Sequence, residues 1–341
     1  MRIKWCVVDL IACGFVRGEV IARCINQKCP NADMVIKSDI MLSDFYKTNV
    51  AVFQRQSTGA MLDKMLTAKQ MGIKVIYELD DNVFEIPVEF QKPYIYYCQP
   101  AVQACIKQFL ANADAITVST HKLALAIRGF CPGKPIFVIP NFIDAETWEP
   151  VFSQKQLDIP EYVTIGWMAS GSHLIDAPLV AEALERLMAE FPALHLHFVG
   201  WIGFDNFKSL ESFKDRIKVE PWIDIHALPY AMKDFDIGLC PLVEHPFNTS
   251  KSNLKWQQYA AMGVPSVVSP VPAYENVQHG KTGLIAEGNT PEAWYHHLKT
   301  LITDEKMRKT IGLTAHQEVL DKWDIRCNYG NWLDTFNQIL K

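Results

Sequence analysis

Two stretches of the sequence combine small, hydroxyl-bearing and cationic residues in a way that suits the binding of a phosphate group. The first runs from Ile165 to His173 and contains Ser170, Gly171 and Ser172. A strand that ends in small residues with exposed N–H groups and hydroxyls allows the backbone to approach a phosphate closely. The stretch matches neither GxGxxG nor GxxxxGK[ST], so it gives no support to a dinucleotide oxidoreductase or to a P-loop. An ordinary strand-to-helix turn is the alternative interpretation.

The second stretch places Lys251, Ser252 and Asn253 where a helix is expected to begin, near residue 252, and that helix is expected to end at Gly263. A cation at the amino terminus of a helix is unfavourable against the helix dipole unless an anion lies between them. This stretch therefore predicts a bound anion, with solvated lysines as the alternative. Two further polar residues follow on the same helical face: Lys255 and Gln258.

Several residues of the first half follow apolar runs that are expected to be strands. Asp80 and Asp81 follow residues 74–79, where they could bind an acceptor or act in acid–base catalysis, or could cap the turn before Phe84. Gly14 and Arg17 follow the first strand, where the backbone could approach a substrate and the guanidinium could face phosphates. Arg55 follows the strand at 50–53. Surface arginines are the alternative for both positions.

No metal is expected. The nine cysteines are scattered and form no CxxC pair, the histidines have no metal-ligand spacing, and Asp80 and Asp81 are adjacent rather than spaced as in a DxD motif. His173 lies in the first stretch, where it could touch a sugar or a phosphate. We find no convincing pair of nucleophile and base.

The elements that must position these residues alternate between short apolar runs and helical periodicity, which predicts an α/β fold with parallel sheets. The expected strands lie at 3–10, 50–53, 74–79, 115–119 and 136–139, and then at 163–168, 194–199, 217–220, 237–241 and 266–269. Prolines and polar residues place a seam at 140–162. We therefore expect two Rossmann-like domains, with a ligand in the cleft between them at the carboxyl ends of the strands.

A resemblance to a known family rests on residues 236–287. This segment, with KSNLKWQQYAAMGVP at 251–265 and GKTGLIAE at 280–287, resembles the carboxy-terminal domain of nucleotide-sugar glycosyltransferases of the GT-B fold, particularly the retaining family 4. The turn at 165–176, FVIPN at 137–141 and YELDDNVF at 77–84 add to the resemblance. It implies an acceptor-side domain at 1–150, a donor-binding domain at 160–323 and a helix at 324–341 that packs back on the first domain, with the sheets facing a central cleft.

The resemblance also implies roles for individual residues. The turn at 170–173 and the helix start at 251–253 would hold the donor diphosphate, and residues 219–223, with Val219 and Trp222, would contact the base. Family members commonly carry two glutamates eight residues apart, and here those positions are Ser250 and Gln258. Gln258 can still bind a ribose hydroxyl through its amide oxygen. The resulting expectations are, as catalytic residues, Asp80, Asp81, His173 and Lys251; as donor-binding residues, Gly14, Arg17, Ser170, Gly171, Ser172, Val219, Trp222, Ser252, Asn253, Lys255 and Gln258; and as acceptor-binding residues, Arg55 and Asn82.

The expected activity is transfer of a sugar from a UDP-sugar or a GDP-sugar to an acceptor hydroxyl, with retention, without a metal and without a permanently bound cofactor. Acceptor glycans, lipid-linked sugars, proteins, small metabolites and hydroxymethylated DNA stay open. A nucleotide-sugar epimerase and a catalytically silent nucleotide-sugar binding protein are the competing functions. DNA would need a basic face, for which only a few residues qualify: Lys64, Lys69, Lys74, Lys92 and Arg128.

The composition agrees with a globular enzyme. The 341 residues carry a net charge of −5, and 49% of them are hydrophobic. This balance disfavours a protein whose main role is to coat nucleic acid. No run reaches the roughly 18 uncharged apolar residues of a membrane span. We expect a cytoplasmic protein, with peripheral attachment to a membrane as an alternative.

Overall fold

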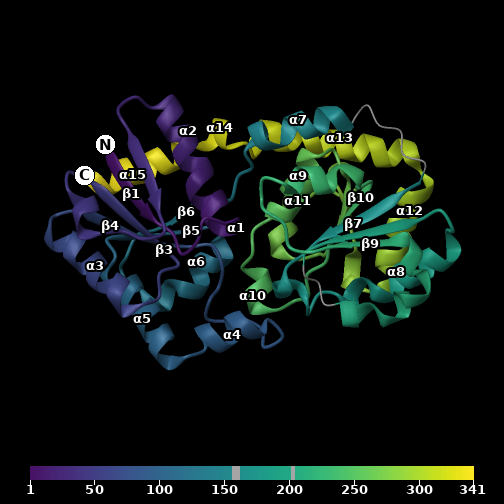
Figure 1. Ribbon diagram of the computed structural model, residues 1–341, viewed down its shortest axis with the longest axis horizontal. Coiled ribbons are helices and arrows are strands. Elements are labelled where there is room, and N and C mark those ends of the chain that lie inside the picture. The colour runs from purple at the N-terminus through teal and green to yellow at the C-terminus, as the bar shows by residue number, and fades with distance from the viewer. Residues whose placement is uncertain (156–161, 201–203) are drawn as a thin grey trace.

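The computed structural model describes residues 1–155, 162–200 and 204–341, which form two α/β halves that lie side by side (Figure 1). Each half is built on a six-stranded sheet in which every pairing is parallel. The amino-terminal half holds β1 (Arg2–Cys6), β2 (Asp33–Lys37), β3 (Val50–Gln54), β4 (Lys74–Leu79), β5 (Ala115–Val118) and β6 (Ile136–Val138). The carboxy-terminal half holds β7 (Thr164–Met168), β8 (His195–Val199), β9 (Ile217–Glu220), β10 (Ile237–Cys240), β11 (Ser266–Val268) and β12 (Leu284–Ile285). The predicted α/β class is confirmed.

The strand orders are β2-β1-β3-β4-β5-β6 and β12-β11-β10-β7-β8-β9, so β3 and β4 lie centrally in the first sheet and β10 and β7 in the second. Continuous apolar runs form these strands because both faces of a parallel sheet are covered by helices. All five residues of β3 are buried, for example. The predicted strand at 3–10 is wrong at its end, since β1 stops at Cys6 and Val8 is 53% exposed.

The helices connect successive strands and cover the sheets. In the amino-terminal half they are α1 (Ala12–Gly14), α2 (Val20–Lys28), α3 (Gly59–Gln70), α4 (Gln91–Tyr97), α5 (Pro100–Asn112) and α6 (His121–Ile127). The remainder are α7 (Ala145–Lys155), α8 (Pro178–Glu190), α9 (Leu228–Ala231), α10 (Pro246–Thr249), α11 (Leu254–Ala261), α12 (Pro291–Thr303), α13 (Glu305–Lys322), α14 (Ile325–Asn328) and α15 (Gly330–Leu340). A π-helical turn at Phe15–Glu19 joins α1 to α2.

The segment between the two sheets differs from the prediction. Helix α7 occupies much of the expected seam at 140–162 and contains Pro150 in its interior. Its buried side chains, Trp148 and Val151 among them, pack into a hydrophobic cluster of the carboxy-terminal half. Packing of this kind outweighs the low helix propensity of proline. The part of the seam at 156–161 lies outside the described residues.

The end of the chain returns to the amino-terminal half. In Figure 1 the yellow helices α13, α14 and α15 run along one edge of both halves, and α15 ends close to β1. Trp332 is fully buried against Trp5 of β1, with the ring centroids 4.9 Å apart. Phe336 lies in the same hydrophobic cluster as Ile3. Residues from the last helix therefore complete the core beneath the first sheet.

The two halves also touch beside the cleft. Phe247 of α10 is 2% exposed and packs into the core of the amino-terminal half. Next to it, the hydroxyl of Thr120 donates a hydrogen bond of 2.8 Å to the carbonyl of Ser250. These contacts fix α10, and the chain that follows it, against the opposite half.

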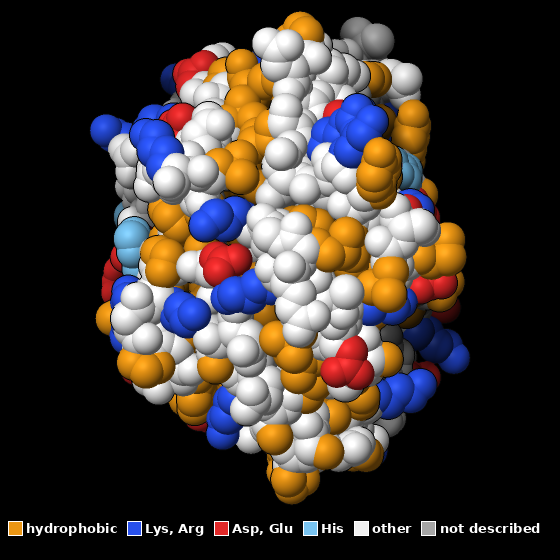
Figure 2. Space-filling view, turned by 90° about the vertical axis from the view of Figure 1, so that its left-hand side faces the viewer, with side chains coloured by type: hydrophobic (Ala, Val, Ile, Leu, Met, Phe, Trp, Pro, Cys, Tyr) orange, Lys and Arg blue, Asp and Glu red, His pale blue; other side chains and the backbone are white. Residues whose placement is uncertain are grey.

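The surface adds two observations. Among the helices of the described residues, none is long and apolar enough to cross a lipid bilayer. On the face seen in Figure 2, Lys and Arg side chains alternate with hydrophobic and acidic ones instead of forming a single basic patch.

Candidate active site

A cleft of about 270 Å³ lies between the two halves, where the carboxyl ends of β4, β7 and β8 meet the start of α11. This is the position at which open parallel sheets usually bind ligands. Ten of the residues expected from the sequence line it: Asp80, Asp81, Ser170, Ser172, His173, Trp222, Lys251, Ser252, Lys255 and Gln258. The residues of both phosphate-like stretches therefore border the same cavity.

Lys251 is the most unusual residue of the cleft. It lies between α10 and α11, and its ammonium group is buried without a hydrogen-bond partner. The ammonium lies over the ring of Phe247, 4.8 Å from the ring centroid. Burial lowers the pKa of Lys251, and Asp176 and Asp81 oppose that shift through their negative charges. A desolvated cation without a partner is costly, and an anion in the cleft would remove that cost.

Lys255 lies one helical turn further on and donates a hydrogen bond to the carbonyl of Met168, at the end of β7. Burial, reinforced by the charge of Lys251 and opposed by Cys240 and Asp176, lowers its pKa to about 8. Both ammonium groups therefore belong to the carboxy-terminal half and face the same cavity as the turn at 170–173.

The low pKa of Lys255 predicts a pH dependence for the binding of a nucleoside diphosphate. Only the protonated amine attracts the diphosphate, so affinity should be constant below the free-state pKa of about 8 and fall above it, by up to roughly tenfold per pH unit. Calorimetric titration of UDP between pH 6.5 and 9.5 measures this, and Lys255→Arg, which stays charged, should shift the decline to higher pH. A constant affinity up to pH 9.5 in the parent protein would contradict the prediction.

The turn after β7 holds its histidine in one orientation. His173 Nδ1 lies 2.8 Å from the Oδ2 atom of Asp176, and the other oxygen of Asp176 accepts hydrogen bonds from the backbone N–H of Val243 and the side-chain amide of Asn248. Burial, with the charges of Lys251 and Lys255 nearby, holds the pKa of His173 well below its usual value. Burial also raises the pKa of Asp176 to about 6. At neutral pH this is a neutral imidazole bonded to a carboxylate, which leaves Nε2 as a hydrogen-bond acceptor.

Positions 250 and 258, where the resemblance implied glutamates, differ in accessibility. Ser250 is 3% exposed, and its hydroxyl donates a hydrogen bond of 2.9 Å to the carbonyl of Pro246. Gln258 lines the cleft beside Leu254. The hydroxyl of Ser250 is therefore committed to its own helix, whereas the amide of Gln258 borders the cavity.

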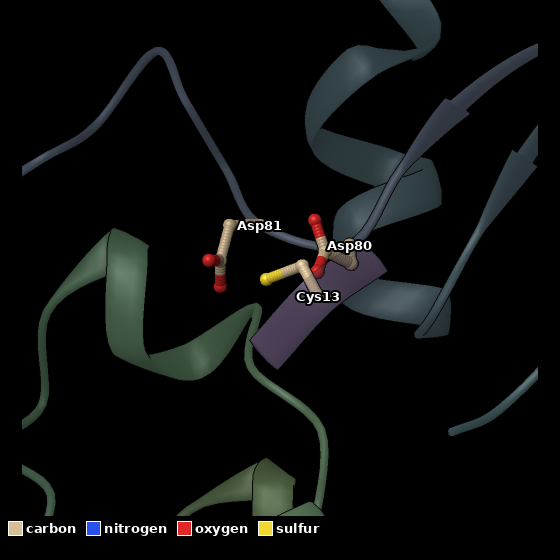
Figure 3. Close-up of side chains that lie close together, drawn as sticks. All are labelled: Cys13, Asp80 and Asp81. Atoms are coloured by element: carbon tan, nitrogen blue, oxygen red, sulfur yellow. The ribbon is translucent and has the colours of Figure 1, made fainter. Parts of the chain in front are cut away.

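Across the cleft, Cys13, Asp80 and Asp81 form a small cluster (Figure 3). One ligand atom from each lies within 4.8 Å of the others. The guanidinium of Arg55 lies 3.0 Å from the sulfur of Cys13 and 3.7 Å from Oδ1 of Asp80. Burial raises the pKa of the Cys13 thiol well above its usual value. A protonated thiol beside a guanidinium is a poor ligand for a metal cation.

Arg55 itself does not line the cleft, contrary to its expected role in acceptor binding. Its backbone has a φ of 53°, a value that L-residues rarely adopt, at the end of β3. This conformation turns the side chain toward Cys13 and Asp80, behind the cleft wall. Asn82 also lies outside the lining residues, because its Oδ1 atom accepts a hydrogen bond from the backbone N–H of Phe84 and so caps the turn.

Two expected donor-binding residues of the first half have other roles. Gly14 does not line the cleft, and a Cβ atom there would lie 1.9 Å from the carbonyl oxygen of Asp9. Its small size allows two backbone segments to approach each other rather than a ligand. Arg17 is 1% exposed, and its guanidinium binds Glu78 at 2.8 Å and the carbonyl of Ile139 at 2.6 Å. It therefore faces the linker between the halves and not a phosphate.

Three residues of the carboxy-terminal half also lie outside the lining. Val219 is 52% exposed on β9, and of the expected base-contacting segment only Trp222 and Ile223 border the cavity. Gly171 is buried inside the short 3-10 turn at Gly171–His173. The side chain of Asn253 is 6% exposed and bonds Asn276 and Gln257.

Several residues that line the cleft were not expected from the sequence, Cys13 and Asn141 among them. Asn141 follows β6 and donates a hydrogen bond of 2.8 Å to the hydroxyl of Ser252, so it joins the linker to the start of α11. Both residues come shortly after a strand of the parallel sheet. Their position after a strand was the feature of the sequence that could have identified them as residues of the site.

The carboxy-terminal half matches a known family. Residues 162–304 match the model of the family described as Glycosyl transferases group 1. A comparison with curated protein sequences finds no match.

Solved structures resemble the whole chain. A sucrose-phosphate synthase from Thermosynechococcus elongatus has a TM-score of 0.71 at 14% identity, over 99% of each chain. HepE of Anabaena, solved with UDP and glucose, has a TM-score of 0.69 at 13% identity, over 98% of this chain and 99% of that chain. A putative UDP-N-acetylglucosamine 2-epimerase from Listeria monocytogenes has a TM-score of 0.59 at 11% identity, over 99% and 96%. The whole chain thus has the GT-B fold, and its residues 162–304 carry a Glycosyl transferases group 1 domain.

Proposed function

We propose that this protein transfers a sugar from a UDP-sugar to an acceptor hydroxyl, with retention of configuration and without a metal ion. The observation that carries the proposal is the ammonium group of Lys251, which borders the cleft and is buried without a hydrogen-bond partner. Folded proteins rarely bury a charged group without a hydrogen-bond partner, and the diphosphate of a nucleotide sugar would supply that partner.

The chemistry of the leaving group supports this assignment. Cleavage of the anomeric bond places negative charge on the departing diphosphate. Lys251 and Lys255 would stabilise that charge as it develops, together with the N–H groups of the turn at 170–173. Cationic side chains at this position can replace the charge stabilisation that a metal ion supplies elsewhere.

Retention of configuration is supported by the fact that His173 and Asp80 are engaged with other side chains. His173 is bonded to Asp176, and the Oδ1 atom of Asp80 is buried 3.7 Å from the guanidinium of Arg55. In a retaining transfer on one face of the sugar, the leaving phosphate can take the acceptor's proton, so no side-chain base is required. If instead Asp81 were a general base, the product would have inverted configuration.

UDP is the favoured nucleotide, with GDP as the alternative. HepE, one of the similar structures, was solved with UDP and with UDP-glucose. In this chain Trp222 is 50% exposed and borders the cleft, which suits stacking on a base, and Gln258 is placed to bond a ribose hydroxyl.

The donor would be bound by the carboxy-terminal domain at 160–323 and the acceptor by the amino-terminal domain at 1–150. A saccharide or a lipid-linked sugar is the favoured acceptor. DNA is disfavoured, because two of the candidate basic residues are already in ion pairs: Lys64 lies 3.5 Å from Asp39, and Lys69 lies 2.9 Å from Asp114.

Incubation with UDP-glucose and related UDP-sugars, with and without saccharide acceptors, tests this function. We expect acceptor-dependent release of UDP, no change on addition of EDTA, and a product whose anomeric proton coupling matches that of the donor. UDP binding without turnover on any donor would instead indicate a binding protein.

The similar structure described as a putative UDP-N-acetylglucosamine 2-epimerase from Listeria monocytogenes makes epimerisation the second candidate. The two reactions differ in their products. An epimerase converts the UDP-sugar in the absence of an acceptor and yields an epimeric sugar, whereas a transferase yields UDP and a glycosylated acceptor. Chromatography of the nucleotide and sugar products separates these outcomes.

A further inference from the structure

The charges that border the cleft are divided between the two halves. Among the described lining residues, the lysines, Lys251 and Lys255, belong to the carboxy-terminal half, and the carboxylates, Asp80 and Asp81, belong to the amino-terminal half. A diphosphate bound at the lysines would leave the attached sugar in the space between the two groups. The sugar's hydroxyls would then meet the opposite wall of the cleft.

The carboxy-terminal half offers no carboxylate to those hydroxyls within the described lining. Asp176 is fully buried behind the turn, with one oxygen bonded to His173 and the other to Val243 and Asn248. Ser250 has its hydroxyl bonded to Pro246. Strong acceptors for sugar hydroxyls must therefore come from across the cleft.

Of the two opposing carboxylates, only one is open to the cavity. Asp80 is 7% exposed, and its Oδ1 atom is buried close to Arg55. Asp81 is half-buried, and Figure 3 shows its carboxyl group turned away from Asp80, toward the carboxy-terminal half. The carboxyl groups of these two adjacent residues therefore lie in different surroundings: that of Asp80 beside Arg55, and that of Asp81 facing the cavity.

We infer that Asp81 binds the hydroxyls of the transferred sugar and so determines which donor sugar the enzyme accepts. This inference rests on the proposed function, since it presumes a UDP-sugar at the lysines. A carboxylate accepts two hydroxyl hydrogen bonds at once, and charge-assisted bonds of this kind are about twice as strong as neutral ones. Neighbouring hydroxyls in the wrong configuration would leave one oxygen unpaired, which penalises the wrong sugar.

Burial and three neighbouring charged groups set the charge of Asp81. Burial and the neighbouring charge of Asp80 raise its pKa, whereas Arg55 and Lys251 lower it, and the thiol of Cys13 lies in the same cluster. Because Lys251 belongs to the opposite half, a closed cleft favours the ionised carboxylate. The docking of Phe247 in the amino-terminal core keeps the two halves in this arrangement.

The test compares the affinity for UDP with the affinity for UDP-sugars. Calorimetry would be performed with UDP, UDP-glucose, UDP-galactose and UDP-N-acetylglucosamine on the parent protein, on Asp81→Asn and on Asp63→Asn, an exposed aspartate of α3 outside the cleft. In the parent, the best of these sugars should bind more tightly than UDP. In Asp81→Asn, UDP should bind within twofold of the parent, whereas that sugar should bind about 10- to 100-fold more weakly. Asp63→Asn should match the parent throughout.

Each outcome has a definite meaning. If UDP does not bind the parent, the proposed function fails. If UDP binds but no sugar increases affinity, or if Asp81→Asn keeps the parent's ratio of UDP-sugar to UDP affinity, the inference alone is wrong. A loss of turnover with unchanged UDP-sugar affinity would also overturn it and would assign Asp81 to acceptor activation. Should Asp81→Asn unfold, Asp81→Glu provides the same comparison, with an altered preference among the three sugars expected.

Discussion

Replacement of Lys251 by alanine is expected to weaken UDP binding by about 30- to 150-fold, because about 2–3 kcal/mol is typical of charge-assisted contacts to a buried anion. The same change should leave the thermal unfolding temperature of the free protein unchanged or slightly higher. The ammonium group of Lys251 has no hydrogen-bond partner and is desolvated, so its removal relieves the free-energy cost of burying an unpaired charge. Calorimetry with UDP and thermal unfolding without ligand measure the two effects.

Lys309→Ala is a suitable control for this experiment. Lys309 is an exposed residue of α13 that pairs with Glu305 at 2.6 Å, and its loss should change neither measurement appreciably. UDP binding by Lys251→Ala within twofold of the parent would contradict the assignment of the phosphate site. A marked fall in unfolding temperature would show that the ammonium stabilises the fold instead.

Replacement of Arg17 by methionine is expected to destabilise the protein by about 3–5 kcal/mol, the usual result of removing one partner of a buried ion pair. Glu78 is fully buried and would lose its 2.8 Å partner. The carbonyl groups of Ile139 and Pro140 would lose donors at the linker between the halves. The midpoint of urea unfolding, followed by tryptophan fluorescence, measures the effect.

A second substitution separates the lost ion pair from lost packing. The double variant Arg17→Met with Glu78→Leu removes both charges, so it should recover a large part of the stability that the single variant loses. Lys309→Met, which breaks the exposed pair with Glu305, should cost less than about 1 kcal/mol. A double variant as unstable as Arg17→Met would show that the guanidinium acts through packing, for example against Trp332.

The parts of the fold that were predictable are those with strong local patterns. The helix expected to begin near residue 252 and end at Gly263 is α11, Leu254–Ala261, and Gly263 has a positive φ of 63°. The central strands were found because burial on both faces requires continuous apolar runs. β2 and β12 were missed, since one contains Asp33 and Lys37 and the other is two residues long.

The residues of the candidate site were likewise predictable only where a local pattern places them. Residues next to strand ends and helix starts, such as Lys251 and His173, border the cleft because local geometry places them there. Arg17 was assigned wrongly because its partner Glu78 is 61 residues away, and no local pattern reveals such a pairing. The same limit applies to Arg55, whose position follows from its own backbone conformation and from contacts with Cys13 and Asp80.

The return of α15 to the first sheet has a consequence for biosynthesis. Trp332 and Phe336 are needed to fill the core beside Ile3 and Trp5. During translation, the apolar face of the first sheet therefore stays uncovered until Trp332 and Phe336 have left the ribosome. Nascent chains of this protein should need chaperone protection for longer than chains whose first domain folds as soon as it emerges.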